Sequence, residues 1–201
     1  MAGTADAAGA DGPEGPAGPA GAAGSAGAEA TARPEYRIER IGPDDWERLR
    51  TIRLAQLLDT PLAFGETHAY ALLQGEGNWR ARTDWLNEPG RIGLVAVDAD
   101  DRWVATMLSI PSRKTATVDL IGVWVDPAHR GRERGVADAL LDAVIAWARE
   151  GGAEWMLLGV HEANDRAAAF YRRRGFTYTG GETPYVLDER ARILEMVLPL
   201  G

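Results

Sequence analysis

The sequence predicts an α/β fold in which helices cover a β-sheet. Segments with helical period alternate with β-branched and apolar runs of strand length. The clearest case is Val118–Glu150, where an apolar run ends at Asp126-Pro127 and a loop leads into a helix. With 201 residues, of which 45% are hydrophobic, the chain is long enough for one domain with a substantial core.

Residues 1–33 are predicted to form a disordered tail, and residues 34–201 the domain. The tail consists mostly of Ala, Gly and Pro with a few acidic residues, and this composition is too poor in hydrophobic side chains to form a core. Glycine recurs at every third position from Gly9 to Gly27, as in collagen, so a short triple helix is the alternative. The small number of triplets and their low proline content favour the disordered tail.

The elements of the domain follow from apolar periodicity and from turn residues. Thr60-Pro61 ends the first helix, an Asp-rich turn joins the two strands of a hairpin, and Gly175 ends the last helix. The predicted order is a strand at Tyr36–Arg40, a helix from Gly42 to about Leu58, a helical region with Trp79 and Trp85, a hairpin of Ile92–Val97 and Trp103–Ile110, a strand at Val118–Val125, a helix at Val136–Glu150, a strand at Trp155–Val160, a helix at Asn164–Arg174, and last strands near Phe176–Thr179 and Ile193–Leu198.

The loop between Asp126 and Val136 has the composition of an anion site. It contains three arginines and two glycines directly before a helix. The first N–H groups of a helix lack intrahelical partners, and the helix dipole makes that end electropositive, so a phosphate can bind there. The spacing matches neither the lysine loop of nucleoside triphosphatases nor the GxGxxG dinucleotide motif.

Composition excludes several classes of protein. The chain has no cysteine, which rules out disulfides, thiolate metal sites and a cysteine nucleophile, and fits a cytoplasmic protein. Its three histidines are scattered and predict no metal site. The formal charge of −8 argues against nucleic acid and anionic membranes as partners, and no apolar run approaches the ~20 residues of a membrane helix.

Two motifs resemble those of the GNAT superfamily of N-acetyltransferases. Arg132, Gly135 and Ala137 match the first, in which Arg or Gln is followed by two residues, Gly, one residue, and Gly or Ala. The second motif matches the residues of the later helix, namely Asn164, Ala167, Phe170, Tyr171, Gly175 and Phe176. The resemblance covers residues 36–200 and implies the GNAT fold, in which helices flank a mixed, twisted central sheet.

The resemblance also implies acetyl-CoA as co-substrate, with no metal. Its pantetheine is expected between the central strand and the Trp155–Val160 strand, and its diphosphate at the loop. Arg130-Gly131 precedes the motif and makes the loop two residues longer than in most relatives. The sequence therefore leaves open which of the arginines binds the diphosphate. The residues expected at acetyl-CoA are Val123, Trp124, Val125, Arg130, Gly131, Arg132, Glu133, Arg134, Gly135, Val136, Ala137, Asn164 and Tyr171.

Tyr171 and Asp119 are the expected catalytic residues. The phenol of Tyr171 is suited to protonating the departing thiolate, since their ordinary pKa values are ~10 and ~8.5; the alternative is a core aromatic. Asp119, expected on the same face of the central strand as Ile121, Val123 and Val125, matches the position of a catalytic glutamate in the histone acetyltransferase branch. The ordinary pKa values of a carboxylate and an ammonium differ by ~6.5 units, so Asp119 cannot take the amine proton unaided. Burial of Asp119, a water relay or binding of the already neutral amine must close most of this gap. A salt bridge or strand-end hydrogen bond is the alternative role.

The acceptor site is less well defined by sequence. Phe64, Glu66 and His161 are expected to contact the acceptor, because a segment similar to residues 60–67 lies beside the acceptor pocket in a GNAT branch; for Phe64, helix packing is the alternative. Glu66, His161 and Glu162 are rival bases.

The sequence therefore predicts an enzyme that moves an acetyl group from acetyl-CoA directly to a primary amine of a small molecule or of a peptide or protein end. The acidic composition favours a small amine or a basic peptide end. A non-catalytic CoA-binding regulatory module is the alternative function, and a homodimer is left open.

Overall fold

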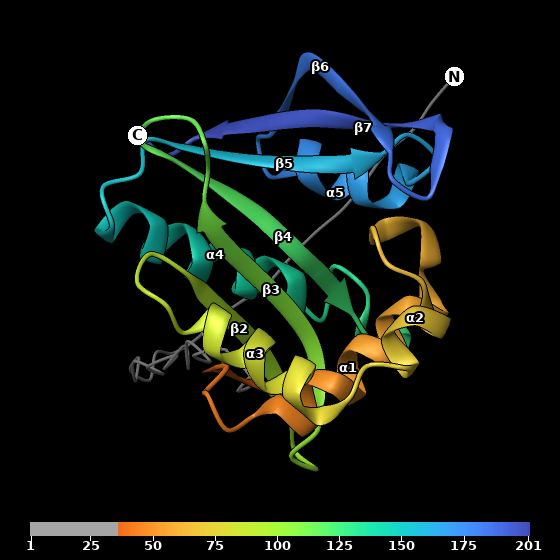
Figure 1. Ribbon diagram of the computed structural model, residues 1–201. Coiled ribbons are helices and arrows are strands. Elements are labelled where there is room, and N and C mark those ends of the chain that lie inside the picture. The colour runs from red at the N-terminus through yellow and green to blue at the C-terminus, as the bar shows by residue number, and fades with distance from the viewer. Residues whose placement is uncertain (1–35) are drawn as a thin grey trace, which may run out of the picture. The chain divides into compact units, whose positions relative to one another are not determined.

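The computed structural model describes residues 36–201, which form one mixed sheet of seven strands with helices on both faces (Figure 1). The α/β prediction with a mixed, twisted sheet is confirmed. The predicted tail, residues 1–33, lies outside the described residues. The strand order is β1-β2-β3-β4-β5-β7-β6, and every neighbouring pair is antiparallel except β4 and β5.

The first five strands lie where the sequence predicts them, within one residue at each end. The bounds are β1 Tyr36–Arg40, β2 Ile92–Asp98, β3 Trp103–Pro111, β4 Thr117–Val125, β5 Trp155–His161, β6 Thr177–Tyr185 and β7 Asp188–Pro199. The last two strands are longer than predicted. Gly180, Gly181 and Pro184 favour a turn in the sequence, yet β6 is the edge of the sheet, where proline and irregular pairing are tolerated.

Helices cover both faces of the sheet. Their bounds are α1 Trp46–Asp59, the short 3₁₀ helix η1 Pro61–Ala63, α2 His68–Leu72, α3 Glu76–Leu86, α4 Val136–Glu150 and α5 Asp165–Arg173. The apolar stripe of α4, with Val136, Leu140 and Val144, packs on the main core cluster with β2, β3, β4 and β5. Side chains of α1, α2 and α3 form two smaller clusters against the other face.

A β-bulge interrupts β4 at Gly122. Across the pair with β3, Thr106 faces Trp124 while Leu108 faces Ile121, so β4 contains one extra residue at this point. Gly122 has φ of +61°, and a Cβ there would lie 2.7 Å from a side-chain carbon of Leu108. Only glycine therefore fits the bulge.

The bulge corrects the predicted orientation of Asp119. Val118 and Leu120, before the bulge, and Val123 and Val125, after it, all pack on the α4 side of the sheet. Asp119 alternates with Val118 and Leu120, so it points to the opposite side. The prediction that Asp119 shares a face with Val123 and Val125 is wrong, because the extra residue breaks the two-residue period.

Candidate active site

The parallel strands β4 and β5 diverge in the middle of the sheet (Figure 1). They pair only over Thr117–Asp119 and Trp155–Leu157, while β5 stays paired with β7 along its whole length. The predicted opening between these two strands is thus present. Two cavities lie along it: the loop cavity, of about 320 Å³, beside the loop before α4, and the splay cavity, of about 730 Å³, between the diverging strands and α1–α3.

The loop cavity places an open helix N-terminus beside an exposed arginine. Gly135, with φ of +65°, directly precedes α4 and provides no side-chain cap to its N–H groups. Arg132 is exposed and lines the same cavity. Uncapped N–H groups, the positive end of the helix dipole and a guanidinium make this part of the cavity suited to an anion.

Arg130 is held by the protein itself. Its Nε donates to the carbonyl oxygen of Val125 over 2.8 Å, and its Nη2 pairs with the carboxylate of Asp59 at the end of α1. The indole Nε1 of Trp124 donates to the same carboxylate over 2.8 Å. These bonds join the end of β4 to α1, and they leave Arg132 as the more accessible arginine of the two.

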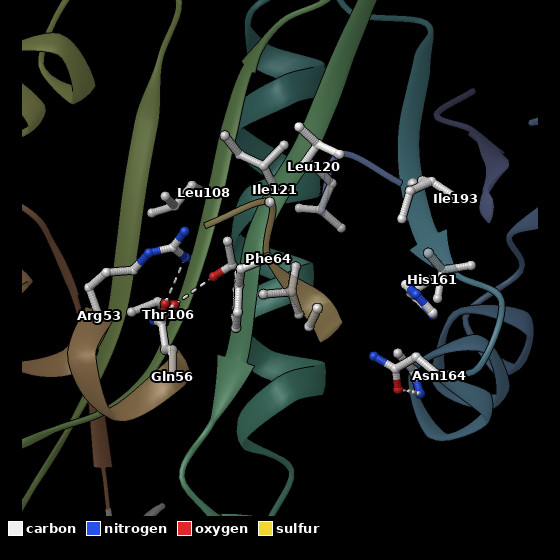
Figure 2. A pocket seen from close by; sticks show the side chains of 18 of the residues that line it. Arg53, Gln56, Phe64, Thr106, Leu108, Leu120, Ile121, His161, Asn164 and Ile193 are labelled. Atoms are coloured by element: carbon white, nitrogen blue, oxygen red, sulfur yellow. Dashed lines mark hydrogen bonds between the residues drawn. The ribbon is translucent and has the colours of Figure 1, made fainter. Parts of the chain in front are cut away.

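The splay cavity is mostly apolar, with polar groups at two sides (Figure 2). The polar groups on one side come from α1, with Arg53 and Gln56; those on the other side come from β5 and the start of α5, with His161 and Asn164. The hairpin β6–β7 contributes Pro184, Tyr185, Val186 and Ile193 to its wall. None of the residues lining this cavity is Asp or Glu.

Two arginines of the splay cavity share one carboxylate. Glu66 accepts from Nη1 and Nη2 of Arg82, at 3.1 and 2.5 Å, and from Nε of Arg53, at 3.0 Å. Burial raises the pKa of Glu66, but the hydrogen bonds from the two arginines lower it by more. Glu66 is therefore an ionised anchor for Arg53 and Arg82 and does not itself line the cavity.

A chain of hydrogen bonds connects Arg53 with the bulge. Its Nη1 donates to Oε1 of Gln56 over 3.2 Å, Nε2 of Gln56 donates to Oγ1 of Thr106 over 2.8 Å, and Oγ1 of Thr106 donates to the carbonyl oxygen of Gly122 over 2.6 Å. Gln56 and Thr106 are buried. The chain fixes the arginine relative to the central strand.

His161, which lines the splay cavity, has one ring nitrogen without a hydrogen-bond partner among the described residues. The backbone N–H of Ala163 donates to its Nδ1 over 3.1 Å, so a neutral ring carries its proton on Nε2. Nε2 is buried and has no hydrogen-bond partner within residues 36–201. In this tautomer Nε2 is a hydrogen-bond donor, while Nδ1 already accepts from Ala163. The ring therefore has no free acceptor nitrogen, which argues against His161 as the base.

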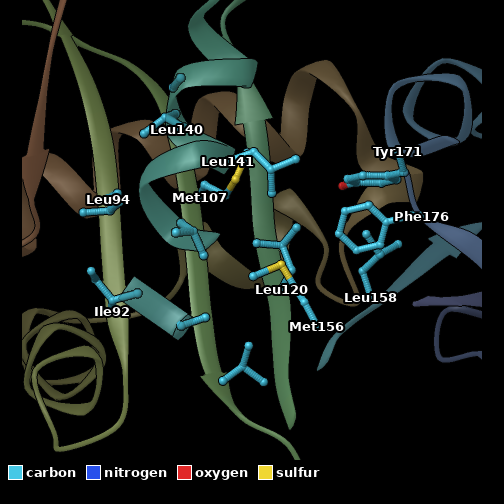
Figure 3. Close-up of a cluster of buried hydrophobic side chains, with 14 of the residues drawn as sticks. Ile92, Leu94, Met107, Leu120, Leu140, Leu141, Met156, Leu158, Tyr171 and Phe176 are labelled. Atoms are coloured by element: carbon cyan, nitrogen blue, oxygen red, sulfur yellow. The ribbon is translucent and has the colours of Figure 1, made fainter. Parts of the chain in front are cut away.

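Tyr171 and Asn164 stand where the two cavities meet. Both line the loop cavity and the splay cavity, as does Val123 of β4. Figure 3 shows the Tyr171 ring beside Phe176 at the edge of the main core, with ring centroids 5.6 Å apart. Burial raises the pKa of the Tyr171 hydroxyl, so it stays protonated at neutral pH. Asn164 caps α5 through Oδ1, which accepts from Ala167 N–H over 3.2 Å.

A family model for the Acetyltransferase (GNAT) family matches residues 52–176, more than half of the chain. The chain belongs to the GNAT acetyltransferase family. Members of this family use acetyl-CoA as co-substrate, and the resemblance inferred from the two motifs is confirmed.

Three relatives illustrate this membership of the GNAT family. Mycothiol acetyltransferase of Propionibacterium freudenreichii is 29% identical over 78% of this chain, which spans about half, 47%, of that protein. An uncharacterised N-acetyltransferase of Mycobacterium bovis is 30% identical over 63% of this chain and 78% of its own length. The structure of yncA from Salmonella typhimurium with its cofactor acetyl-CoA has the same fold, with a TM-score of 0.66, 22% identity, and coverage of 83% of this chain and 94% of that one.

Two kinds of feature are absent from the part of the chain that the structure describes. Within residues 36–201, no cluster of three or more His, Asp or Glu side chains could hold a metal ion. In the same range, no helix is both long and apolar enough to cross a bilayer.

The structure brings together most of the residues expected at acetyl-CoA, but it places the expected base, Asp119, in neither cavity. Those that line the loop cavity are Val123, Trp124, Val125, Arg130, Gly131, Arg132, Ala137, Asn164 and Tyr171. Asp119 lines neither cavity and lies in the paired part of β4 and β5, opposite Leu157. Glu162 is exposed and accepts from the N–H of Arg192 over 3.0 Å.

Sequence reasoning missed Arg53, Gln56, Arg82 and Tyr185 as residues of the site. One signal was present in α1, where Gln56 follows Leu49 and Ile52 on the buried stripe, because a polar side chain at such a position needs a buried partner. Arg82 and Tyr185 carry no such signal, since their place depends on contacts between distant parts of the chain.

Proposed function

We propose that this protein is an N-acetyltransferase that moves the acetyl group of acetyl-CoA directly to a primary amine. The observation that carries the proposal is the continuity of the two cavities, which meet at Tyr171, Asn164 and Val123. A ligand whose phosphates bind at the start of α4 can extend along the gap between β4 and β5, so that its thioester end meets an acceptor in the splay cavity.

The residues proposed to hold acetyl-CoA follow from this path. The N–H groups at the start of α4 and the Arg132 guanidinium bind the diphosphate, and the free amide nitrogen of Asn164 and the backbone near Val123 bind the pantetheine. The carbonyl oxygen of Val125 is a weaker candidate, because it already accepts from Arg130.

The reaction forms a C–N bond between the amine nitrogen and the acetyl carbon and breaks the C–S bond. The neutral amine attacks with its lone pair, the sulfur leaves with the electron pair of the C–S bond, and the product amide loses one N–H proton. Tyr171 donates its hydroxyl proton to the leaving sulfur. Burial raises the pKa of this hydroxyl, which keeps it protonated until the thiolate forms but also widens the pKa gap to the thiol beyond that of the ordinary values. The chain has no cysteine to form an acyl-thioester intermediate, which favours direct transfer.

The proton of the amine leaves by another route. Because no carboxylate lines the splay cavity, the acceptor binds as a neutral amine or passes its proton to water. Asp119, predicted as the base from the sequence, can act in this scheme only through a water relay, since it lies outside both cavities. We further propose that the protein works in the cytoplasm, in keeping with a chain free of cysteine.

Release of free thiol from acetyl-CoA in the presence of a panel of small amines and short peptides tests the proposal. We expect amine-dependent thiol release with at least one acceptor and its strong reduction in Tyr171→Phe. A protein that raises its melting temperature with CoA but releases no thiol with any amine would instead be the non-catalytic CoA-binding module, and the proposal would be wrong.

A further inference from the structure

We propose that the acceptor is a small primary amine that also carries a carboxylate on an apolar body, and that Arg53 and Arg82 bind this carboxylate. The inference rests on the proposed function and specifies its substrate class. It follows from the charges, the free donors and the apolar lining of the splay cavity.

The charges of the splay cavity favour an anion. Arg53 and Arg82 line it, Glu66 behind them is their shared partner, and no other Asp or Glu within residues 36–201 forms an ion pair with either arginine. Two positive charges beside one negative charge leave a net charge of +1 at the wall. A carboxylate balances this charge, whereas a phosphate dianion exceeds it.

The arginines are also positioned to receive a ligand. Each uses two of its five N–H donors within the described residues, Arg53 on Glu66 and Gln56 and Arg82 on Glu66 alone. The guanidinium carbon of Arg53 lies 4.5 Å from the centre of the Phe64 ring, and that of Arg82 lies 4.5 Å from the centre of the Trp79 ring. Stacked and ion-paired guanidinium groups lose little freedom when they bind a carboxylate.

His161 points to the same acceptor chemistry from the other side of the cavity (Figure 2). Its buried Nε2 is a donor without a partner, and an oxygen of the ligand would satisfy it. A cationic acceptor would meet two arginines and no carboxylate on the walls. The cavity therefore disfavours the basic peptide end that the net charge of the whole chain suggests, because the local charges decide binding.

The remaining walls set the apolar part of the ligand. Phe64, Leu108, Ile121 and Ile193 contribute apolar side chains around the centre of the cavity. The Arg53–Gln56–Thr106–Gly122 chain of hydrogen bonds ties Arg53 to the bulge, while Tyr171 lies with Val123 where the splay cavity meets the loop cavity. An acceptor that spans this space has its amine toward Tyr171 and its carboxylate toward Arg53.

The test compares amines that differ only in the carboxylate. L-Phenylalanine is paired with phenethylamine, and 6-aminohexanoate with pentylamine, so that a near and a far carboxylate are both sampled. For the wild-type protein with acetyl-CoA, kcat/KM from thiol release should favour the carboxylate member of at least one pair by about 10- to 100-fold, the range of a charge-assisted hydrogen bond.

The variant Arg82→Gln assigns that preference to the arginines. The ratio of kcat/KM within a pair should fall toward 1 in Arg82→Gln and recover in Arg82→Lys, and comparing ratios cancels the different basicities of the two amines. Arg80→Gln is the matched control, because Arg80 lies on the same helix, is exposed and pairs with Glu76. Its ratio should equal that of the wild type.

The outcomes separate this inference from the proposed function. Turnover of phenethylamine, pentylamine or diamines with no advantage for any carboxylate would overturn the inference and leave the N-acetyltransferase standing. A carboxylate preference that survives in Arg82→Gln and in Arg53→Gln would also overturn it. If Arg82→Gln fails to fold, the wild-type ratios together with Arg53→Gln still decide. If no amine of any kind supports thiol release, both proposals are overturned.

Discussion

The hydroxyl of Tyr185 donates to the carbonyl oxygen of Phe64 over 2.7 Å, and it also lies 3.2 Å from the carbonyl oxygen of Pro61. These bonds tie the tip of the β6–β7 hairpin to the segment between α1 and α2. Because both segments line the splay cavity, the Tyr185 hydroxyl holds two of its walls together.

Tyr185→Phe should weaken acceptor binding more than acetyl-CoA binding. The change removes the hydroxyl and keeps the ring, so the free energy of unfolding should fall by about 0.5–1.5 kcal/mol, the net value of a hydrogen bond. We expect KM for the acceptor to rise while Kd for acetyl-CoA is unchanged. An equal loss for both ligands would show that the hairpin does not act on the acceptor side alone.

The position of this hairpin shows a limit of sequence analysis. Apolar periodicity predicts the positions of β2 to β5, α1, α4 and α5, because each contains buried side chains in a run or a stripe. It fails for residues 180–192, where the edge strand β6 is exposed over nearly all its length and offers no alternation to detect. The contact of Tyr185 with Phe64 joins residues 121 positions apart, so no local pattern predicts it.

Arg132→Ala and Arg130→Ala should have different effects. Arg132 is exposed at the loop cavity, so its loss should weaken acetyl-CoA binding by about 1.5–3 kcal/mol with the melting temperature unchanged. Arg130 holds Asp59 and Val125, so its loss should lower the melting temperature and change binding less. Isothermal titration with acetyl-CoA and thermal unfolding measure both. A larger binding loss in Arg130→Ala would assign the diphosphate to Arg130.

Asp59 should contribute stability that is lost in acid. Burial raises the pKa of Asp59, but hydrogen bonds from Arg130, Thr60 and Trp124 lower it by more, to about 2. Since this pKa lies below the ~3.9 of an unfolded Asp, the contribution is complete above about pH 4 and disappears as the pH falls toward 2. In urea unfolding, Asp59→Asn should be less stable than wild type at pH 6, by about 1 kcal/mol after screening, and this gap should narrow below about pH 4 and close toward pH 2. A gap independent of pH would contradict the ion pair.

The bulge at Gly122 explains why the site was predicted only in part. Both motifs point to residues that do line the cavities, Arg132 and Tyr171 among them. The two-residue period, applied through the bulge, places Asp119 on the wrong face. A lone glycine in a strand does not reveal from sequence whether the strand contains an extra residue at that point. The charges at the acceptor side arise from α1 and α3, far in sequence from both motifs.

Asp119→Asn tests the remaining assignment of a base. If Asp119 accepts the amine proton through water, the loss of turnover should be largest at low pH and shrink as rising pH deprotonates the amine in solution. The measurement is kcat/KM for the acceptor between pH 6 and 9, with Glu162→Gln as the rival carboxylate. A defect that is constant with pH would mean that Asp119 takes no proton, and an effect confined to Glu162→Gln would move the assignment there.

The most direct test of the account is single-turnover thiol release from acetyl-CoA by Tyr171→Phe under saturating acceptor. The variant keeps the ring and its packing against Phe176 and removes only the proton donor at the junction of the two cavities. The account predicts an unchanged melting temperature, an unchanged Kd for acetyl-CoA and a rate of release lower by ~10²–10⁴-fold. A rate equal to that of the wild type, with thiol release still the slow step, would contradict the role of Tyr171 as the acid.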